Sequence, residues 1–252
     1  MSKRKTQTAV KDYIAEGFVR EALVNYLAYL GWSPGTEEDV LALEEIVERF
    51  DLEAVQKGGA VFDRVRMEWL NGQWIRRLAD DDLVDRLAPF LEADWAAGRI
   101  DRNPTRDEIA AVLPLVRERL PVLGAVGDLV GFVFRDGVDL DPTLLVPKRW
   151  ERGTALAGLA AASRAIDALG DPGDPGAAGA GGFTVESLET ALRSAAEANG
   201  WKAGDLFMTI RVALTGKTAT PPLLESMVVL GRERTLERLD RAAHALEAES
   251  PA

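Results

Sequence analysis

The stretch RVALTGKTATPPLLE, residues 211–225, decides the fold, because its Gly216-Lys217-Thr218 looks like the end of a phosphate-binding loop. Such a loop also needs a glycine five residues before the Gly-Lys pair, and it must join a strand to a helix. Arg211 occupies that position, and the preceding DLFMTIRVAL has the pattern of a buried helix. The sequence therefore argues against a phosphate-binding loop.

The same stretch is better explained as a corner between two helices. Thr220 precedes a proline and is therefore disfavoured in the α region, whereas Pro221 suits the first turn of a new helix. We predict a helix–loop–helix corner on which Lys217 and Thr220 are exposed.

Helical periodicity continues through the rest of the chain. Residues 19–32 carry an apolar stripe that stops at Gly31, and residues 36–50 begin with Thr36 followed by acids in the first turn. Residues 62–78 predict a helix with Val65, Trp69 and Leu70 inward and a weak point at Asn71-Gly72. Further helices are predicted at about 80–94, 105–120, 121–134, 147–169, 183–199, 203–214, 221–230 and 232–248. Because alternating strand patterns are nearly absent, the predicted fold is all-α.

Breaks in this pattern suggest domain boundaries. GDPGDPGAAGAGG, residues 170–182, has the composition of a flexible loop between two helices. Softer boundaries lie near residues 78–82, where a run of acids follows Arg76-Arg77, and near GVDLDPTLLVP, residues 137–147. These breaks divide the chain into residues 1–82, 83–142 and 143–252.

Composition limits the possible partners and sites. The chain has 252 residues, of which 47% are hydrophobic and 28% charged, as expected for a globular protein of one to three domains. It has no cysteine, so disulfides and thiolate zinc sites are excluded. No apolar run approaches the roughly 18 residues of a membrane span. We expect a cytoplasmic protein with neither membrane nor DNA as a partner, although a net charge of −11 does not exclude a basic face.

The inventory of catalytic side chains is poor. His244 is the single histidine, and no carboxylates have the spacing of metal ligands, so no metal site is predicted. The remaining candidates are basic residues at helix ends and corners, which fit contacts to an RNA phosphate backbone or are ordinary surface charges. They are Lys3, Arg4, Lys5, Arg76, Arg77, Arg117, Arg119, Lys148, Arg149, Arg193, Arg211 and Lys217.

Three long stretches together resemble the C-terminal half of bacterial glutamyl-tRNA synthetases. They are MSKRKTQTAVKDYIAEGFVREALVNYLAYLGWS (1–33), LEEIVERFDLEAVQKGGAVFDRVRMEWLNGQWIRRL (43–78) and RVALTGKTATPPLLESMVVLGRERTLERL (211–239). The resemblance runs over almost the whole chain. It implies a lysine-loop remnant and helical stem-contact domain over residues 1–82. Two helical bundles of the class I synthetase anticodon-binding type would follow over residues 83–142 and 143–252.

The first stretch begins with a remnant of catalytic chemistry. Met1-Ser2-Lys3-Arg4 resembles the mobile lysine loop of class I synthetases, which implies that Lys3, flanked by Ser2 and Arg4, lies against the ATP phosphates. A cation at that point stabilises negative charge as it develops. The alternative is a frayed basic N-terminus.

The resemblance also implies what this chain lacks. The nucleotide-binding domain that precedes the lysine loop in the family is absent, and adenylate formation requires its pocket to position ATP and the amino acid. We therefore expect the chain alone to bind no cofactor and to be inactive as a ligase. ATP and Mg²⁺ would belong to the intact enzyme, and a separate catalytic half is a candidate partner.

By resemblance, the main partner is tRNA(Glu). Arg119 in LPLVRERLPVL matches the arginine that contacts the third anticodon base in the family and disfavours the guanine of glutamine tRNA. Arg117 is an alternative match two residues earlier. The matching positions in the second bundle are Arg193, Arg211, Thr220, Pro221 and Leu223, with Lys217 as a further candidate.

These residue types suit the recognition of unpaired bases. Unstacked bases are read by hydrogen bonds to their edges and by packing on their faces. For Pro221 and Leu223, packing at the start of a helix is an equally simple explanation. The alternative function is a stand-alone helical RNA-binding or interaction module without a ligase role. An enzyme of another type is the weakest interpretation, because the acid and base groups are scattered.

Overall fold

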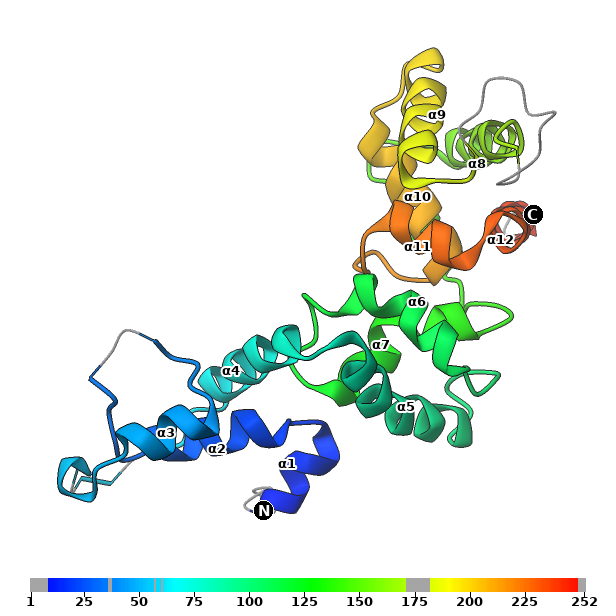
Figure 1. The fold of residues 1–252 in the computed structure, drawn as a ribbon. Coiled ribbons are helices and arrows are strands. Elements are labelled where there is room, and N and C mark those ends of the chain that lie inside the picture. Colours follow the sequence, from blue (N-terminus) through cyan, green and yellow to red (C-terminus); the bar gives the residue numbers. More distant parts are fainter. Residues whose placement is uncertain (1–8, 36–37, 57, 60, 171–181, 249–252) are drawn as a thin grey trace, which may run out of the picture. The chain divides into compact units, whose positions relative to one another are not determined.

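The computed structural model of the chain describes residues 9–35, 38–56, 58, 59, 61–170 and 182–248. Within these ranges the protein consists of twelve α-helices and short 3-10 turns, with no strand (Figure 1). The all-α prediction is therefore confirmed. Ser2, Lys3 and Arg4 lie outside the described residues, as does most of the predicted loop 170–182.

The chain forms two compact units, residues 1–131 and residues 132–252, which we call the N-terminal and C-terminal units. The predicted boundary near residue 82 lies inside the N-terminal unit. The division into three domains stays a prediction.

The N-terminal unit is built on pairs of packed helices. The helix α2 packs against α4, and α5 packs against α6. Its elements are α1 (Val10–Glu16), α2 (Arg20–Tyr29), α3 (Leu43–Arg49), η1 (Leu52–Ala54), α4 (Arg64–Arg77), α5 (Asp80–Ala96), α6 (Arg106–Val116), η2 (Leu123–Ala125) and α7 (Val126–Val130).

The helix α4 is held at its centre by Asn71. The Asn71 side chain is fully buried, accepts a hydrogen bond from the Val19 N–H (2.8 Å) and donates one to the Pro121 carbonyl (2.7 Å). The predicted weak point at Asn71-Gly72 is thus wrong, because α4 runs unbroken through it. These bonds also fix the rotation of α4 about its axis. As a result Val65 and Trp69, which were expected to point inward, are exposed, while Leu70 is buried as predicted.

The helix predicted to begin at Thr36 starts later than expected. Thr36 lies outside the described residues, residues 38–42 are not helical, and α3 begins at Leu43. The Leu41 N–H donates to Asn25 Oδ1 (3.1 Å), which places the fully buried Leu41 side chain in a small core with Trp32 and Ile46. Residues 38–42 are therefore extended, because this conformation buries Leu41, although the sequence has the periodicity of a helix.

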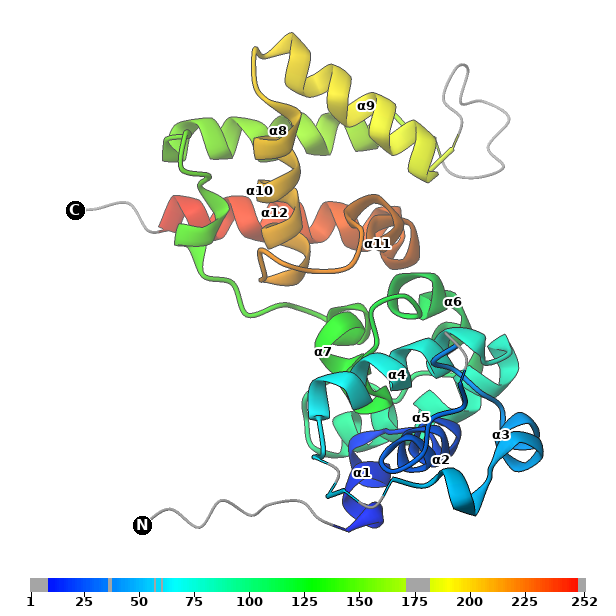
Figure 2. The same ribbon diagram turned by 90° about the vertical axis from the view of Figure 1, so that its left-hand side faces the viewer.

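The C-terminal unit is a bundle in which α8 packs against α12 and α10 crosses both (Figure 2). Its elements are η3 (Gly131–Phe134, which begins at the last residue of the N-terminal unit), η4 (Pro142–Leu145), α8 (Arg152–Asp167), α9 (Val185–Ala198), α10 (Ala203–Thr215), α11 (Leu223–Leu230) and α12 (Arg232–Ala248). The predicted helices of this part are confirmed to within about two residues at their ends, except that α8 begins at Arg152 and not at residue 147 as predicted.

The buried Arg238 of α12 ties this bundle together. Its guanidinium donates to the carbonyl oxygens of Leu214 (2.6 Å), Phe132 (2.8 Å) and Arg135 (2.6 Å). Burial, reinforced by neighbouring arginines, lowers the pKa of Arg238 to about 10. Arg238 thereby links the last turn of α10, just before the Gly216 corner, to η3 and to the residue that follows it.

No helix in the described ranges is long and apolar enough to cross a membrane. The same residues contain no group of three or more histidines, cysteines, aspartates or glutamates that could hold a metal ion. His244 is exposed on α12, where its ring lies 3.4 Å from the Asp240 carboxylate one turn earlier.

Candidate nucleic-acid interface

The quoted stretch forms the predicted corner between α10 and α11. Gly216 ends α10 with a φ of 70°, in the left-handed region that favours glycine. A Cβ atom at Gly216 would overlap the carbonyl oxygen of Asp139, so this position also requires glycine for close approach. Lys217 is exposed as predicted, whereas Thr220 is half-buried. The helix α11 begins at Leu223 rather than at Pro221, with Pro222 as its N-cap.

Arg211 holds this corner closed from the side of α10. Its Nη1 atom donates to the Thr220 hydroxyl oxygen (2.7 Å) and to the Pro221 carbonyl oxygen (3.1 Å). The Thr220 hydroxyl in turn donates to the Pro221 carbonyl (3.1 Å). Partial burial lowers the pKa of Arg211 from its ordinary value, although an arginine remains charged at neutral pH. The corner is therefore a hydrogen-bonded structure and not a loose loop.

An aromatic side chain of α10 lies against Arg193. The Arg193 guanidinium carbon lies 5.5 Å from the centre of the Phe207 ring, within the range of a cation–π interaction. Phe207 precedes Arg211 by one turn of α10, so the two side chains share a face of that helix. Arg193 also pairs with Glu189 on α9 (2.8 Å). We call Arg193, Phe207, Arg211 and Thr220 the arginine strip of the C-terminal unit.

Sequence reasoning missed Phe207. The signal that could have identified it is an aromatic residue four positions before Arg211 in DLFMTIR.

Pro221 and Leu223 lie largely inside the C-terminal unit. Pro221 is buried, and Leu223 is only 5% exposed. Both side chains therefore contribute to packing at the start of α11. Their contact with RNA bases stays a prediction.

The structure separates the two candidates in LPLVRERLPVL. Arg117 donates to the carbonyl oxygens of Arg76 (3.2 Å) and Leu78 (2.6 Å) and pairs with Asp80. Its guanidinium is therefore engaged in joining the end of α6 to the link between α4 and α5. The Arg119 side chain is instead exposed, at the rim of a hollow beside Trp69. Of the two, Arg119 is the arginine that a ligand can reach.

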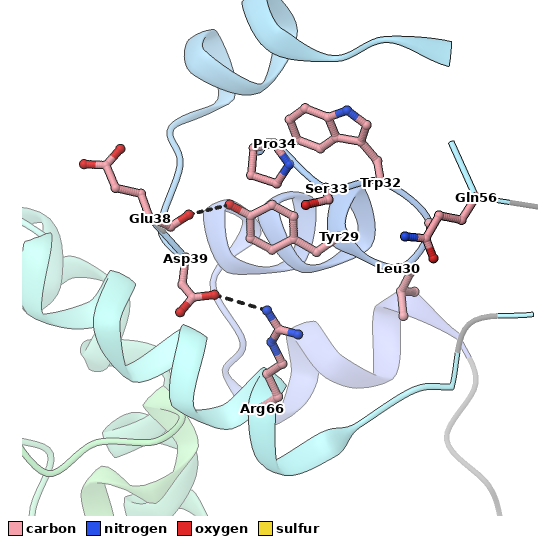
Figure 3. Close-up of a pocket in the computed structure, with 10 residues that line it drawn as sticks. Tyr29, Leu30, Trp32, Ser33, Pro34, Glu38, Asp39, Gln56 and Arg66 are labelled. Carbon is pink, nitrogen blue, oxygen red and sulfur yellow. Dashed lines mark hydrogen bonds and ion pairs between the residues drawn. The ribbon is translucent and has the colours of Figure 1, made fainter. Parts of the chain in front are cut away.

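A second hollow in the N-terminal unit has a different character (Figure 3). Its volume is about 210 Å³, and two of its polar side chains are already paired: Tyr29 donates to the Glu38 carbonyl (2.9 Å) and Arg66 donates to Asp39 (3.1 Å). Burial raises the pKa of Tyr29. Two carboxylates against one arginine make this hollow a poor site for phosphate. Its lining residues are Tyr29, Leu30, Gly31, Trp32, Ser33, Pro34, Glu38, Asp39, Gln56 and Arg66.

Comparison with known proteins places these features in a family. Residues 82–243 match the family described as anticodon binding domain. Residues 1–69 match the family described as tRNA synthetases class I (E and Q), catalytic domain.

Curated relatives match nearly the whole chain. The glutamate–tRNA ligase of Roseiflexus castenholzii is 39% identical over 251 residues, which cover 98% of this chain and 47% of the relative. That of Herpetosiphon aurantiacus is 38% identical over 253 residues, 99% of this chain and 48% of the relative. The chain thus spans about half the length of the curated relatives it matches.

A solved structure agrees with the fold. The crystal structure of a glutamate tRNA ligase from Elizabethkingia meningosepticum has a TM-score of 0.75 at 24% sequence identity. The match covers 93% of this chain and 43% of that protein. The resemblance to glutamyl-tRNA synthetases is confirmed, and the chain belongs to the anticodon binding domain family, to the part of it whose curated members are glutamate–tRNA ligases.

Proposed function

We propose that this chain is the tRNA(Glu)-binding, anticodon-recognising half of a glutamyl-tRNA synthetase and thus serves translation in the cytoplasm. The observation that carries the proposal is the match of residues 82–243 to an anticodon binding domain. Nothing in the sequence or the fold favours the alternative of a stand-alone interaction module.

The arginine strip supplies the chemistry that such binding needs. Arg211 is held by Thr220 through Nη1 alone, and the planar guanidinium carries further donors on Nε and Nη2. Because the first bond fixes the orientation of the plane, the remaining donors are pre-organised for a base edge or a phosphate. Lys217 adds positive charge on the same corner, and Arg193 adds a second guanidinium, whose charge Glu189 compensates in part. An unpaired anticodon base is the proposed ligand, since stacked bases of a duplex do not offer their faces.

Arg119 is proposed to contact the third anticodon base and to select glutamate tRNA over glutamine tRNA. Its exposure supports this role, whereas Arg117 is bound by backbone carbonyls. Thr220 is proposed to offer its hydroxyl or the adjacent backbone. Pro221 and Leu223 are proposed to act chiefly by fixing the corner.

A catalytic half is the second proposed partner. Leu43 and Val47 of α3 and Phe50, which follows the helix, form an exposed apolar surface, with exposed fractions of 54%, 70% and 41%. Ile46, at the edge of this surface, packs into the small core with Trp32 and Leu41, and the centre of the Phe50 ring lies 5.5 Å from that of Trp32. This exposed apolar surface lies in residues 1–69, the segment that matches the class I catalytic domain. We propose that the nucleotide-binding part of a class I catalytic domain covers it.

That partner would supply the ligase chemistry. ATP and Mg²⁺ are proposed to act in the catalytic half, with Lys3 placed near the ATP phosphates. The chain alone is expected to form no glutamyl-tRNA.

A direct binding titration tests the tRNA proposal. Fluorescence anisotropy of labelled tRNA(Glu) should show binding whose affinity falls steeply between 50 and 200 mM salt, as phosphate-dominated contacts require. Arg211→Ala should weaken the complex by roughly tenfold, on the scale of one strong polar contact. Arg152→Ala, on α8, is the control and should bind like the native chain. Absence of binding at low salt would refute the proposal.

Complementation tests the second partner. The half of the R. castenholzii ligase that this chain does not match would be added together with glutamate, ATP and Mg²⁺. Glutamylation of tRNA(Glu) should require both halves, and Val47→Glu should reduce it. Val228→Glu on α11 places the same charge at another exposed valine and should leave it unchanged. Glutamylation by this chain alone would contradict the proposal.

A further inference from the structure

The hollow beside Trp69 is a separate feature of the N-terminal unit. It has a volume of about 160 Å³ and lies between α4 and the turn that follows α6. We call it the Trp69 hollow. It is lined by Glu68, Trp69, Gly72, Arg76, Arg119, Leu120 and Pro121.

Two contacts make the walls of the Trp69 hollow rigid. The buried Asn71 side chain donates to the Pro121 carbonyl (2.7 Å), which joins α4 to the opposite wall. A Cβ atom at Gly72 would come within 3.3 Å of the Leu120 carbonyl oxygen, so the two walls are already in close contact. The hollow therefore exists in the isolated unit and does not need a ligand to form.

The charges around the Trp69 hollow leave Arg119 available. Glu68 pairs with Arg64 (2.8 Å), and Glu118 pairs with Arg76 (2.9 Å). These pairs neutralise the nearby acids. Among the residues that the structure describes, no side chain pairs with the exposed Arg119 guanidinium. An unneutralised cation thus lies at the rim.

The aromatic wall is accessible as well. Trp69 is 47% exposed, although the next two residues of α4, Leu70 and Asn71, are buried. An accessible indole beside a free guanidinium suits a flat aromatic group that carries a negative charge. Bases of single-stranded nucleic acids stack on aromatic side chains in this way, and arginine binds the attached phosphate.

The volume of the hollow limits the size of the ligand that it can hold. Pockets for whole small molecules usually enclose about 300–1,000 Å³. The Trp69 hollow is smaller, so it accommodates a single base of a larger molecule whose remaining contacts lie elsewhere.

We infer that the Trp69 hollow holds one unpaired nucleotide of a bound RNA, with its base against the Trp69 indole and the Arg119 guanidinium beside that base. This inference rests on the proposed tRNA binding and adds a contact on α4, outside the residues 82–243 that match the anticodon binding domain. Trp69 is thus assigned as an RNA-binding residue.

Paired tryptophan variants of the full chain test this assignment. Trp69→Ala should weaken binding of labelled tRNA(Glu) by roughly tenfold, the loss expected for one stacked base, whereas Trp69→Phe should retain most of the affinity. Trp95 on α5 is also 47% exposed, so Trp95→Ala is the matched control and should bind like the native chain. Arg119→Ala should weaken binding and relax the preference for tRNA(Glu), as expected for an arginine that contacts a base. Thermal unfolding followed by circular dichroism checks that each variant is folded.

The outcomes separate this inference from the function on which it rests. If the native chain binds tRNA(Glu) and Trp69→Ala binds as well as Trp95→Ala, the inference is overturned and the proposed function stands. If the native chain does not bind tRNA(Glu), both are overturned. Ultraviolet crosslinking of the complex provides a second readout, because a nucleotide adduct on the peptide that contains Trp69 is expected and an adduct confined to other peptides would contradict the inference.

Discussion

The Nη1 atom of Arg211 lies 2.7 Å from the hydroxyl oxygen of Thr220, and this bond joins the last turns of α10 to the far side of the Gly216 corner. The bond explains why a stretch with the composition of a loop holds a defined shape. It also holds an arginine of the proposed anticodon interface in a fixed set of hydrogen bonds. Substitutions that remove one of these bonds should therefore lower both the stability of the protein and its affinity for RNA.

Removal of the Thr220 hydroxyl should loosen the corner. Thr220→Val keeps the shape of the side chain but leaves Arg211 Nη1 with only carbonyl acceptors, which should lower the free energy of unfolding by about 1 kcal/mol. Affinity for tRNA(Glu) should fall at the same time. Thr218→Val, at an exposed position of the same corner, is the control. Urea denaturation and anisotropy titrations measure the two effects, and equal behaviour of the two variants would refute the role of this bond.

Gly216 should tolerate no side chain. Gly200 has the same φ of 70° as Gly216, but a Cβ atom at Gly200 meets nothing within 4 Å. Gly200→Ala therefore measures the cost of the left-handed conformation alone, about 1 kcal/mol. Gly216→Ala adds the overlap with the Asp139 carbonyl and should be clearly more destabilising in urea denaturation. If the two alanine variants were equally stable, the close approach to Asp139 would be disproved.

The ion pair of Glu21 and Arg86 should make stability depend on pH. Two hydrogen bonds from Arg86 (2.8 and 2.9 Å) lower the pKa of Glu21 from 4.5 to about 2. Because the pKa is lower in the folded state, the stabilisation is complete above about pH 5 and is lost as the pH falls toward 2. Glu21→Gln should therefore cost about 1 kcal/mol at pH 7, a value reduced by partial solvent exposure, and little near pH 2.

The exposed Glu48 provides the control for this pH dependence. Glu48→Gln should change stability little at either pH. Urea denaturation of both variants at pH 7 and near pH 2 makes the comparison. A difference between Glu21→Gln and the native chain that did not shrink with falling pH would contradict the assignment to this carboxylate.

Features of the fold that local chemistry determines could be predicted from the sequence. The corner at Gly216 is one, because a glycine and two prolines constrain the backbone directly. The late start of α3 could not be predicted, since it depends on Leu41 and on its bond to Asn25, sixteen residues earlier. The outward position of Trp69 likewise depends on Asn71 and its bonds to Val19 and Pro121, distant residues that no local pattern reveals.

In the candidate interface, too, some features could be predicted from the sequence and others depend on the fold. The sequence supplied the arginines and a resemblance that the comparisons support, but it could not distinguish Arg117 from Arg119. The distinction depends on the carbonyls of Arg76 and Leu78, which the fold brings to Arg117. Phe207 was not identified from the sequence, because its cation–π contact with Arg193 depends on the packing of α9 against α10.

Competition between two transfer RNAs measures whether the chain recognises the glutamate anticodon. The native chain and Arg119→Gln would each be bound to labelled tRNA(Glu) and challenged with unlabelled tRNA(Glu) or tRNA(Gln). We predict that the native chain prefers tRNA(Glu) and that Arg119→Gln, while still folded and binding RNA, loses much of this preference. Equal competition by both transfer RNAs against the native chain would contradict the claim that this half of the protein recognises the glutamate anticodon.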